Sequence, residues 1–217
     1  MFIGHFAVGL ASKSVVPKPS LGTYFAAVSF LDLLWPPLLL LGIEHVKIDP
    51  GNTVHTPLAF IDYPYSHSLL MTLVWSALFG GIYFAIRRDR PGAVMLGLGV
   101  ASHWVLDAIT HRPDLPLAPG SATLIGFGLW NSMAGTIIVE GAMFIAAVYL
   151  YAKSTRAKDK TGSIAFLSLI AFLVIAYIFD AMGTPPPNEQ ALAWFALTGW
   201  LFVPWGWWIE RHREGRV

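Results

Sequence analysis

The chain has 217 residues, of which 55% are hydrophobic and 12% are charged, and its formal net charge is +1. A soluble domain carries about 25% charged residues, so this composition excludes an ordinary soluble domain and predicts an integral membrane protein. Cysteine is absent, which excludes disulfides, thiolate metal ligands and a cysteine nucleophile. The sequence has no phosphate-binding loop motif and no basic, aromatic-rich stretch, so we expect no nucleic-acid partner.

Apolar segments divide the sequence into predicted helices. Residues 1–12 are apolar but too few to cross a bilayer, which predicts a short re-entrant or interfacial helix, and they lack the basic region of a cleavable signal peptide. Six longer stretches approach the roughly 20 apolar residues that a span requires. They cover residues 21–43, 67–86, 92–110, 133–152, 162–182 and 191–209. We therefore expect an all-α, polytopic membrane helical bundle that forms one integral membrane domain over residues 1–217.

Basic residues are distributed unevenly over the connections between these spans. One side of the predicted topology carries twelve of the 14 Lys and Arg residues, which are Lys13, Lys18, Arg87, Arg88, Arg90, Lys153, Arg156, Lys158, Lys160, Arg211, Arg213 and Arg216. The other side carries Lys47 and Arg112. Because cytoplasmic loops are enriched in Lys and Arg, we predict a multi-pass membrane protein with both termini on the cytoplasmic side.

Titratable residues gather near the predicted outer ends of the spans. His103, Asp107 and His111 recur every four residues in the third span, so successive members lie about 40° apart on one helix face. An ionisable group inside a bilayer is costly unless it is paired or bound to metal, which makes this face a candidate functional site. In the first span, Asp32 precedes the Trp35–Pro36–Pro37 segment. We expect the double proline to break or kink that helix and to lift Asp32 toward the same outer half.

Imidazole and carboxylate groups of this kind suit a divalent metal ion, with zinc as the first expectation and manganese or iron as alternatives. The predicted metal ligands are His5, Asp32, His67, His103 and Asp107. The alternative is that these polar side chains hydrogen-bond between helices and only hold the bundle together.

Three further residues are candidates for catalytic roles. Glu140 is an isolated carboxylate in an apolar helix, where it can carry a proton as an acid or base or hydrogen-bond to a neighbouring helix. His111, at the predicted water interface, is a second candidate proton carrier, with helix capping as the alternative. Arg112 can bind an anionic group of a substrate or pair with Asp114.

Four short motifs resemble those of a known family. They are a His on a short N-terminal helix (His5), an Asp on the next hydrophobic helix (Asp32), Ser66–His67–Ser68 at a helix start, and an HxxxDxxT pattern from His103 to Thr110. Together they resemble bacterial inner-membrane metal-dependent hydrolases of the LexA-regulated membrane hydrolase type. The resemblance covers about the first half of the chain. It implies a location in the bacterial inner membrane and a helical core distantly similar to zinc phospholipase C, with His and Asp residues that bind metal.

Two departures from that family pattern bear on the number of metal ligands. Tyr63–Pro64–Tyr65 stands where the family often has His-Arg-Gly, and the run from Phe30 to Pro36 keeps only one acidic residue. Both changes remove groups that a multinuclear site would use. A mononuclear site, or a site without catalysis, is therefore favoured.

The function expected from these features is hydrolysis of an ester or phosphoester of a membrane lipid or amphiphile, at a metal site in the outer half of the bilayer. Membrane lipid is then both the environment and a possible substrate. Two alternatives use the same residues. One is a transporter or channel for protons or divalent metal ions. The other is a non-catalytic structural protein whose polar residues lock the helices together.

Overall fold

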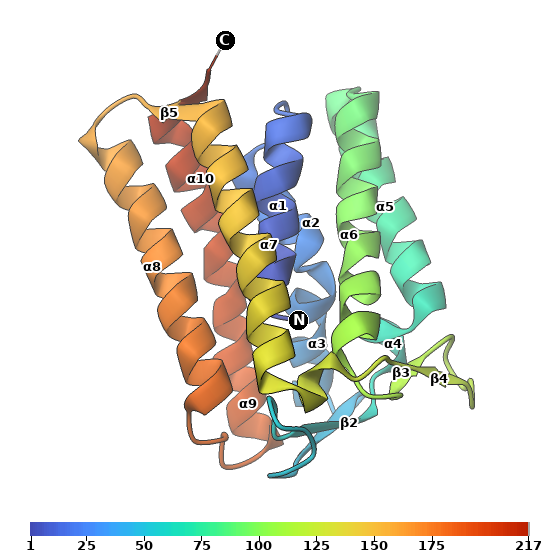
Figure 1. The fold of residues 1–217 in the computed structure, drawn as a ribbon. Coiled ribbons are helices and arrows are strands. Elements are labelled where there is room, and N and C mark those ends of the chain that lie inside the picture. The colour runs from blue at the N-terminus through green and yellow to red at the C-terminus, as the bar shows by residue number, and fades with distance from the viewer. Residues whose placement is uncertain (217) are drawn as a thin grey trace.

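The computed structural model describes residues 1–216 as a helical bundle with short strands at both ends (Figure 1). The helices are α1 (Ile3–Val15), α2 (Leu21–Val28), α3 (Phe30–Leu40), α4 (Pro64–His67), α5 (Leu69–Arg87), α6 (Arg90–Thr110), α7 (Met133–Ser154), α8 (Lys160–Met182), α9 (Glu189–Ala196) and α10 (Phe202–His212). Two 3-10 helices are η1 (Leu129–Asn131) and η2 (Leu197–Leu201). The strands are β1 (His45–Ile48), β2 (Leu58–Asp62), β3 (Leu115–Pro116), β4 (Leu124–Ile125), β5 (Thr155–Ala157) and β6 (Arg213–Gly215).

The long helices confirm the predicted membrane bundle. Within residues 1–216, five segments are long and apolar enough to cross a membrane: α5, α6, α7, α8 and the Glu189–His212 segment that contains α9, η2 and α10. The bent pair of α2 and α3 supplies a sixth if both helices count as one span. The strands form three antiparallel pairs, β1 with β2, β3 with β4, and β5 with β6. In Figure 1 the first two pairs lie at one end of the bundle and the third at the other.

The first span bends at a different place from the one predicted. The helix axis turns by 56° between α2 and α3, at Ser29, whereas Pro36 and Pro37 lie inside α3 without ending it. Proline has no N–H, so Pro37 leaves the carbonyl of Leu33 without its usual helical donor. The indole Nε1–H of Trp200 donates to that carbonyl at 3.2 Å. The carbonyl of Leu33 thus has a hydrogen-bond donor from a different helix. The predicted break at the prolines took into account only donors within the same helix.

Helix α1 lies inside the bundle, as a re-entrant helix does. It contacts α2, α6, α7 and α8, and Ile3, Phe6 and Leu10 join a core cluster that includes residues of α2, α7, α8 and α10. Its first turn is therefore held at the middle of the bundle, next to α6. This position brings an N-terminal residue such as His5 close to the third predicted span.

The two ends of the bundle differ in charge. Figure 1 shows that α1, α5, α7 and α10 end, and α6 and α8 begin, at the end where the C-terminus lies. The twelve basic residues of the predicted cytoplasmic side lie in or beside these helix ends. The opposite end carries Lys47 in β1 and Arg112 after α6. The geometry is thus compatible with the positive-inside rule, while the orientation in a membrane stays a prediction.

Candidate metal centre

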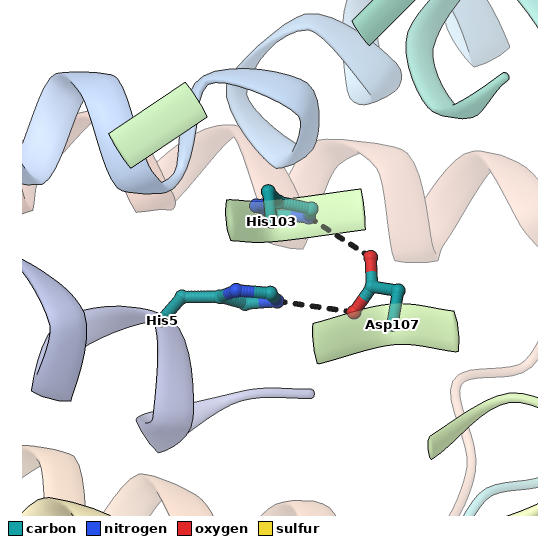
Figure 2. Close-up of side chains that lie close together, drawn as sticks. All are labelled: His5, His103 and Asp107. Carbon is teal, nitrogen blue, oxygen red and sulfur yellow. Dashed lines mark hydrogen bonds and ion pairs between the residues drawn. The ribbon is translucent and has the colours of Figure 1, made fainter. Parts of the chain in front are cut away.

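The site is built on the buried face of α6. His103 and Asp107 are one helical turn apart, so both side chains point to the same side, and Nε2 of His103 lies 3.1 Å from Oδ2 of Asp107 (Figure 2). Both residues are buried, with relative exposures of 0% and 2%. The two side chains are therefore held together in the interior, as their spacing predicted.

Three other elements bring the remaining predicted ligands to this face. His5 of α1 places Nε2 3.1 Å from Oδ1 of Asp107. Asp32 of α3 places Oδ1 3.6 Å from Nε2 of His103, and His67 of α4 places Nε2 3.5 Å from the same Asp32 oxygen and 3.9 Å from Oδ2 of Asp107. We call His5, Asp32, His67, His103 and Asp107 the five-residue cluster.

Candidate ligand atoms of the cluster form two overlapping groups. One consists of His5, His103 and Asp107, and the other of Asp32, His67 and His103, with the ligand atoms of each group within 4.8 Å of one another. Four of the five side chains are almost completely buried, whereas that of Asp32 is 48% exposed. The cluster is thus enclosed on most sides and open at Asp32.

The hydrogen bonds of His103 define which of its nitrogens faces the cluster. Nδ1 lies 2.7 Å from the backbone carbonyl of Val28. A carbonyl can only accept, so Nδ1 carries the proton. Val28 is the last residue of α2, where the bend at Ser29 interrupts the helix, so its carbonyl is available to a side chain. Nε2 is buried and has no hydrogen-bond partner among the described residues.

The ring orientations separate the roles of the three histidines. The His67 and His103 rings meet at 65° with centroids 5.4 Å apart, so their in-plane lone pairs can converge. The His5 and His103 rings are stacked, with 4° between their planes and centroids 3.7 Å apart. Lone pairs in two stacked rings run side by side rather than toward one point. On Asp107, Oδ1 faces His5 and the amino nitrogen of Met1, which lies 2.6 Å away.

The three predicted catalytic residues lie outside the five-residue cluster. Glu140 is buried in α7, and its Oε2 accepts from the backbone N–H groups of Phe2 at 2.9 Å and Gly4 at 3.2 Å, at the start of α1. His111 is buried at the end of α6 against Trp130, with ring centroids 4.3 Å apart. Arg112 is 41% exposed at its side chain. Their catalytic roles stay predictions.

His111 belongs to a small polar group of its own. Its Nδ1 lies 2.9 Å from Oδ1 of Asp114, which also accepts from the hydroxyl of Tyr63 at 2.9 Å. Burial raises the pKa of Tyr63 well above its usual value, so the phenol stays protonated and acts as the donor. Nε of Arg112 lies 3.5 Å from the other oxygen of Asp114. Arg112 therefore pairs with a carboxylate, the alternative that its sequence position left open.

The buried state of His111 predicts a pH dependence of stability. Burial lowers the pKa of His111 below its usual value, and this outweighs the hydrogen bond to Asp114. The unfolded chain, with a pKa of about 6.5, then binds more protons than the folded one, so stability is lost as the pH falls below about 6.5. We expect the thermal unfolding midpoint in detergent to fall over this range. The variant His111→Gln should show a shallower slope, and an unchanged slope would refute the assignment.

Two residues next to the cluster were not among the site residues predicted from the sequence. Ser66 hydrogen-bonds to Nδ1 of His67 at 2.7 Å, and the buried carboxylate of Glu44 hydrogen-bonds to Ser66 at 2.6 Å. Ser66 adjoins His67 in the sequence, so the Ser-His-Ser motif was a usable signal. Glu44 lies 22 residues before Ser66 in the turn between α3 and β1, and no sequence periodicity connects the two.

Comparison with known proteins gives a family match over most of the chain. No curated protein and no solved structure matches it. The family described as YdjM inner membrane protein matches residues 1–184, a range that contains the whole five-residue cluster. Because this match covers most of the 217 residues, the chain belongs to the YdjM inner membrane protein family.

Proposed function

We propose that this protein is a membrane-embedded, metal-dependent hydrolase that cleaves an ester or phosphoester of a lipid or amphiphile. Zinc is the first expectation for the metal, with manganese or iron as alternatives. The observation that carries the proposal is the environment of Nε2 of His103, a buried nitrogen that lies 3.1 and 3.6 Å from carboxylate oxygens of Asp107 and Asp32, while Nδ1 is held by the carbonyl of Val28. Acceptors that face one another in a buried site are stabilised by a cation between them.

The spacing of the ligand atoms supports one four-coordinate ion. Zinc bonds to histidine nitrogen and carboxylate oxygen are about 2.0–2.2 Å long, so two ligand atoms of a tetrahedral site lie about 3.3–3.6 Å apart. The four nitrogen–oxygen distances among His67, His103, Asp32 and Asp107 are 3.1, 3.5, 3.6 and 3.9 Å. These distances scatter around the tetrahedral value. Because a catalytic ion keeps one of its four positions for water, we assign His67, His103 and Asp107 as the ligands and the position beside Oδ1 of Asp32 to the water.

His5 has a different role in this proposal. Its ring is stacked on that of His103, so the lone pairs of the two rings run side by side and cannot both point to one ion. Its Nε2 lies 3.1 Å from Oδ1 of Asp107, the oxygen turned away from His67 and His103. We assign His5 to orient Asp107 by donating to this oxygen, as carboxylate ligands are commonly held by a second hydrogen bond.

The chemistry follows from the open side of the cluster. A bound divalent ion lowers the pKa of a coordinated water toward 7 and polarises the ester group. Asp32, with half of its side chain exposed, is the member placed to accept a proton from the attacking water. Glu140 and His111 remain candidates to carry that proton onward, and Arg112 to bind an anionic group. By the positive-inside rule the site faces the outer leaflet, where a lipid reaches it laterally.

The proposal is tested by assaying hydrolysis in nanodiscs. Wild-type protein loaded with Zn²⁺, Mn²⁺ or Fe²⁺ is given fluorescent phospholipid and carboxylic-ester lipid substrates. We expect turnover in the wild type and a loss of at least about 100-fold in Asp32→Asn, the range typical of losing a general base. Asp62→Asn is the matched control, since Asp62 is an exposed carboxylate in β2 at the same end of the bundle. Metal-loaded protein that cleaves neither substrate class would overturn the proposal, and ion flux into vesicles would favour the transporter alternative.

A further inference from the structure

A buried series of hydrogen bonds leads from Glu44 to the cluster. The hydroxyl Oγ of Ser66 lies 2.6 Å from Oε2 of Glu44 and 2.7 Å from Nδ1 of His67. Glu44 and Ser66 are both 0% exposed, and His67 is 3% exposed. On the far side of the imidazole, Nε2 of His67 lies 3.5 Å from Oδ1 of Asp32. We call Glu44, Ser66 and His67 the relay.

The donors around Glu44 determine the direction of each hydrogen bond in the relay. Oε1 of Glu44 accepts from the backbone N–H groups of Tyr65 and Ser66, both at 2.8 Å. The hydroxyl of Ser66 donates to Oε2, and a hydroxyl has only one proton to donate. Ser66 can then only accept at its other contact. Nδ1 of His67 must therefore carry a proton, and in the neutral imidazole the lone pair is then on Nε2, the nitrogen that faces the cluster.

We propose that Glu44, acting through Ser66, is a positioning residue that fixes His67 in the Nδ1–H tautomer, the form whose Nε2 can bind a metal ion. The effect on metal binding rests on the proposed function, whereas the effect on the tautomer does not. Nδ1 of His103 is likewise kept protonated by a different partner, the carbonyl of Val28. The two histidines assigned as ligands are thus oriented by separate elements, the Glu44 turn and the end of α2.

The substitution Glu44→Gln tests the direction of the relay with almost no change of shape. The two backbone N–H groups at Oε1 require an acceptor, so the glutamine must place its oxygen there and its NH₂ group toward Ser66. That NH₂ group donates to the hydroxyl of Ser66, which then donates to Nδ1 of His67. His67 is converted to the Nε2–H tautomer, which has no lone pair toward Asp32 and Asp107.

The experiment measures the tautomer and the metal affinity separately. Metal-free protein with ¹⁵N-labelled histidine is studied by NMR in detergent or nanodiscs, and the His67 signals are assigned with His67→Gln. We expect Nδ1–H in the wild type, Nε2–H in Glu44→Gln, and a mixture of tautomers in Ser66→Ala, which removes the relay without reversing it. Zinc affinity should fall by about 10- to 100-fold in Glu44→Gln, the usual effect of losing a partner of a metal ligand.

Glu189→Gln is the matched control, because Glu189 lies 3.5 Å from His45 and outside the cluster. In this variant the tautomer of His67 and the zinc affinity should equal those of the wild type. An Nδ1–H tautomer of His67 that persists in both Glu44→Gln and Ser66→Ala would overturn the inference. If Glu44→Gln does not fold, a single Nδ1–H tautomer in Ser66→Ala overturns it alone. A tautomer change in a protein that binds no metal would support the inference while refuting the proposed function.

Discussion

Protein in which both His103 and Asp107 are replaced by alanine is expected to lose its bound metal on purification. The wild type, purified in detergent, should retain zinc, manganese or iron at a near-stoichiometric level by elemental analysis. The double variant removes two of the three assigned ligands, including Nε2 of His103 with its 3.1 Å approach to Asp107. Loss of a mere partner of a ligand already weakens binding by about 10- to 100-fold, so loss of two ligands should exceed that.

A matched control distinguishes loss of ligands from loss of a buried histidine. His111 follows the same helix and is 3% exposed, but its Nδ1 contacts Asp114 and not the cluster. His111→Ala should therefore keep the wild-type metal content. Circular dichroism and gel filtration of each variant establish that the bundle is folded. A folded double variant with full metal content would show that the assigned site is wrong.

Replacement of Gly206 by valine is expected to lower the thermal unfolding midpoint of the protein in detergent by about 2–12 °C. Helices α2 and α10 approach closely at Gly22 and Gly206, where a Cβ added to Gly206 would lie 2.6 Å from the Cα of Gly22. Backbone atoms on the facing helix cannot move aside as a flexible side chain can. Overpacking of this kind costs about 1–3 kcal/mol, and each kcal/mol corresponds to about 2–4 °C for a chain of this size.

The same substitution should reach the metal centre, because α2 ends in Val28, whose carbonyl holds His103. Displacement of α2 should weaken metal binding although Gly206 touches none of the assigned ligands. Gly81→Ala in α5 is the control, since nothing lies within 4 Å of a Cβ built there. Alanine is the better helix former, so this variant should match or exceed the wild-type midpoint. A Gly206→Val protein as stable as the wild type would contradict the close approach of α2 and α10.

Several features could be predicted from the sequence because they depend on local composition and spacing. Runs of apolar residues predicted the spans, and over residues 1–216 the structure confirms a bundle with five or six helical segments long and apolar enough to cross a membrane. The family match confirms the inner-membrane prediction, while hydrolase activity and the identity of the metal stay proposals. The four-residue interval between His103 and Asp107 placed both on one helix face, because helical geometry alone fixes that relation.

The approach of His5, Asp32 and His67 to that face could not follow from composition or periodicity. Short motifs suggested that these residues act together, but the packing of α1, α3 and α4 against α6 decides whether they meet. Local rules also misplaced the bend of the first span. Two prolines remain inside α3 while Trp200 donates to the carbonyl of Leu33, and the break at Ser29 leaves the carbonyl of Val28 free for His103.

By itself the sequence determined a membrane bundle, the uneven distribution of its basic residues and the two titratable residues on one face of α6. The physical reason is that hydropathy and helical periodicity act over a few neighbouring residues. Only the tertiary structure decided which distant groups surround that face, namely the stacked ring of His5, the half-exposed carboxylate of Asp32 and the buried relay from Glu44 to His67. Apart from the contact between the neighbours Ser66 and His67, these contacts join residues between 22 and 102 positions apart, and they form only when the helices pack.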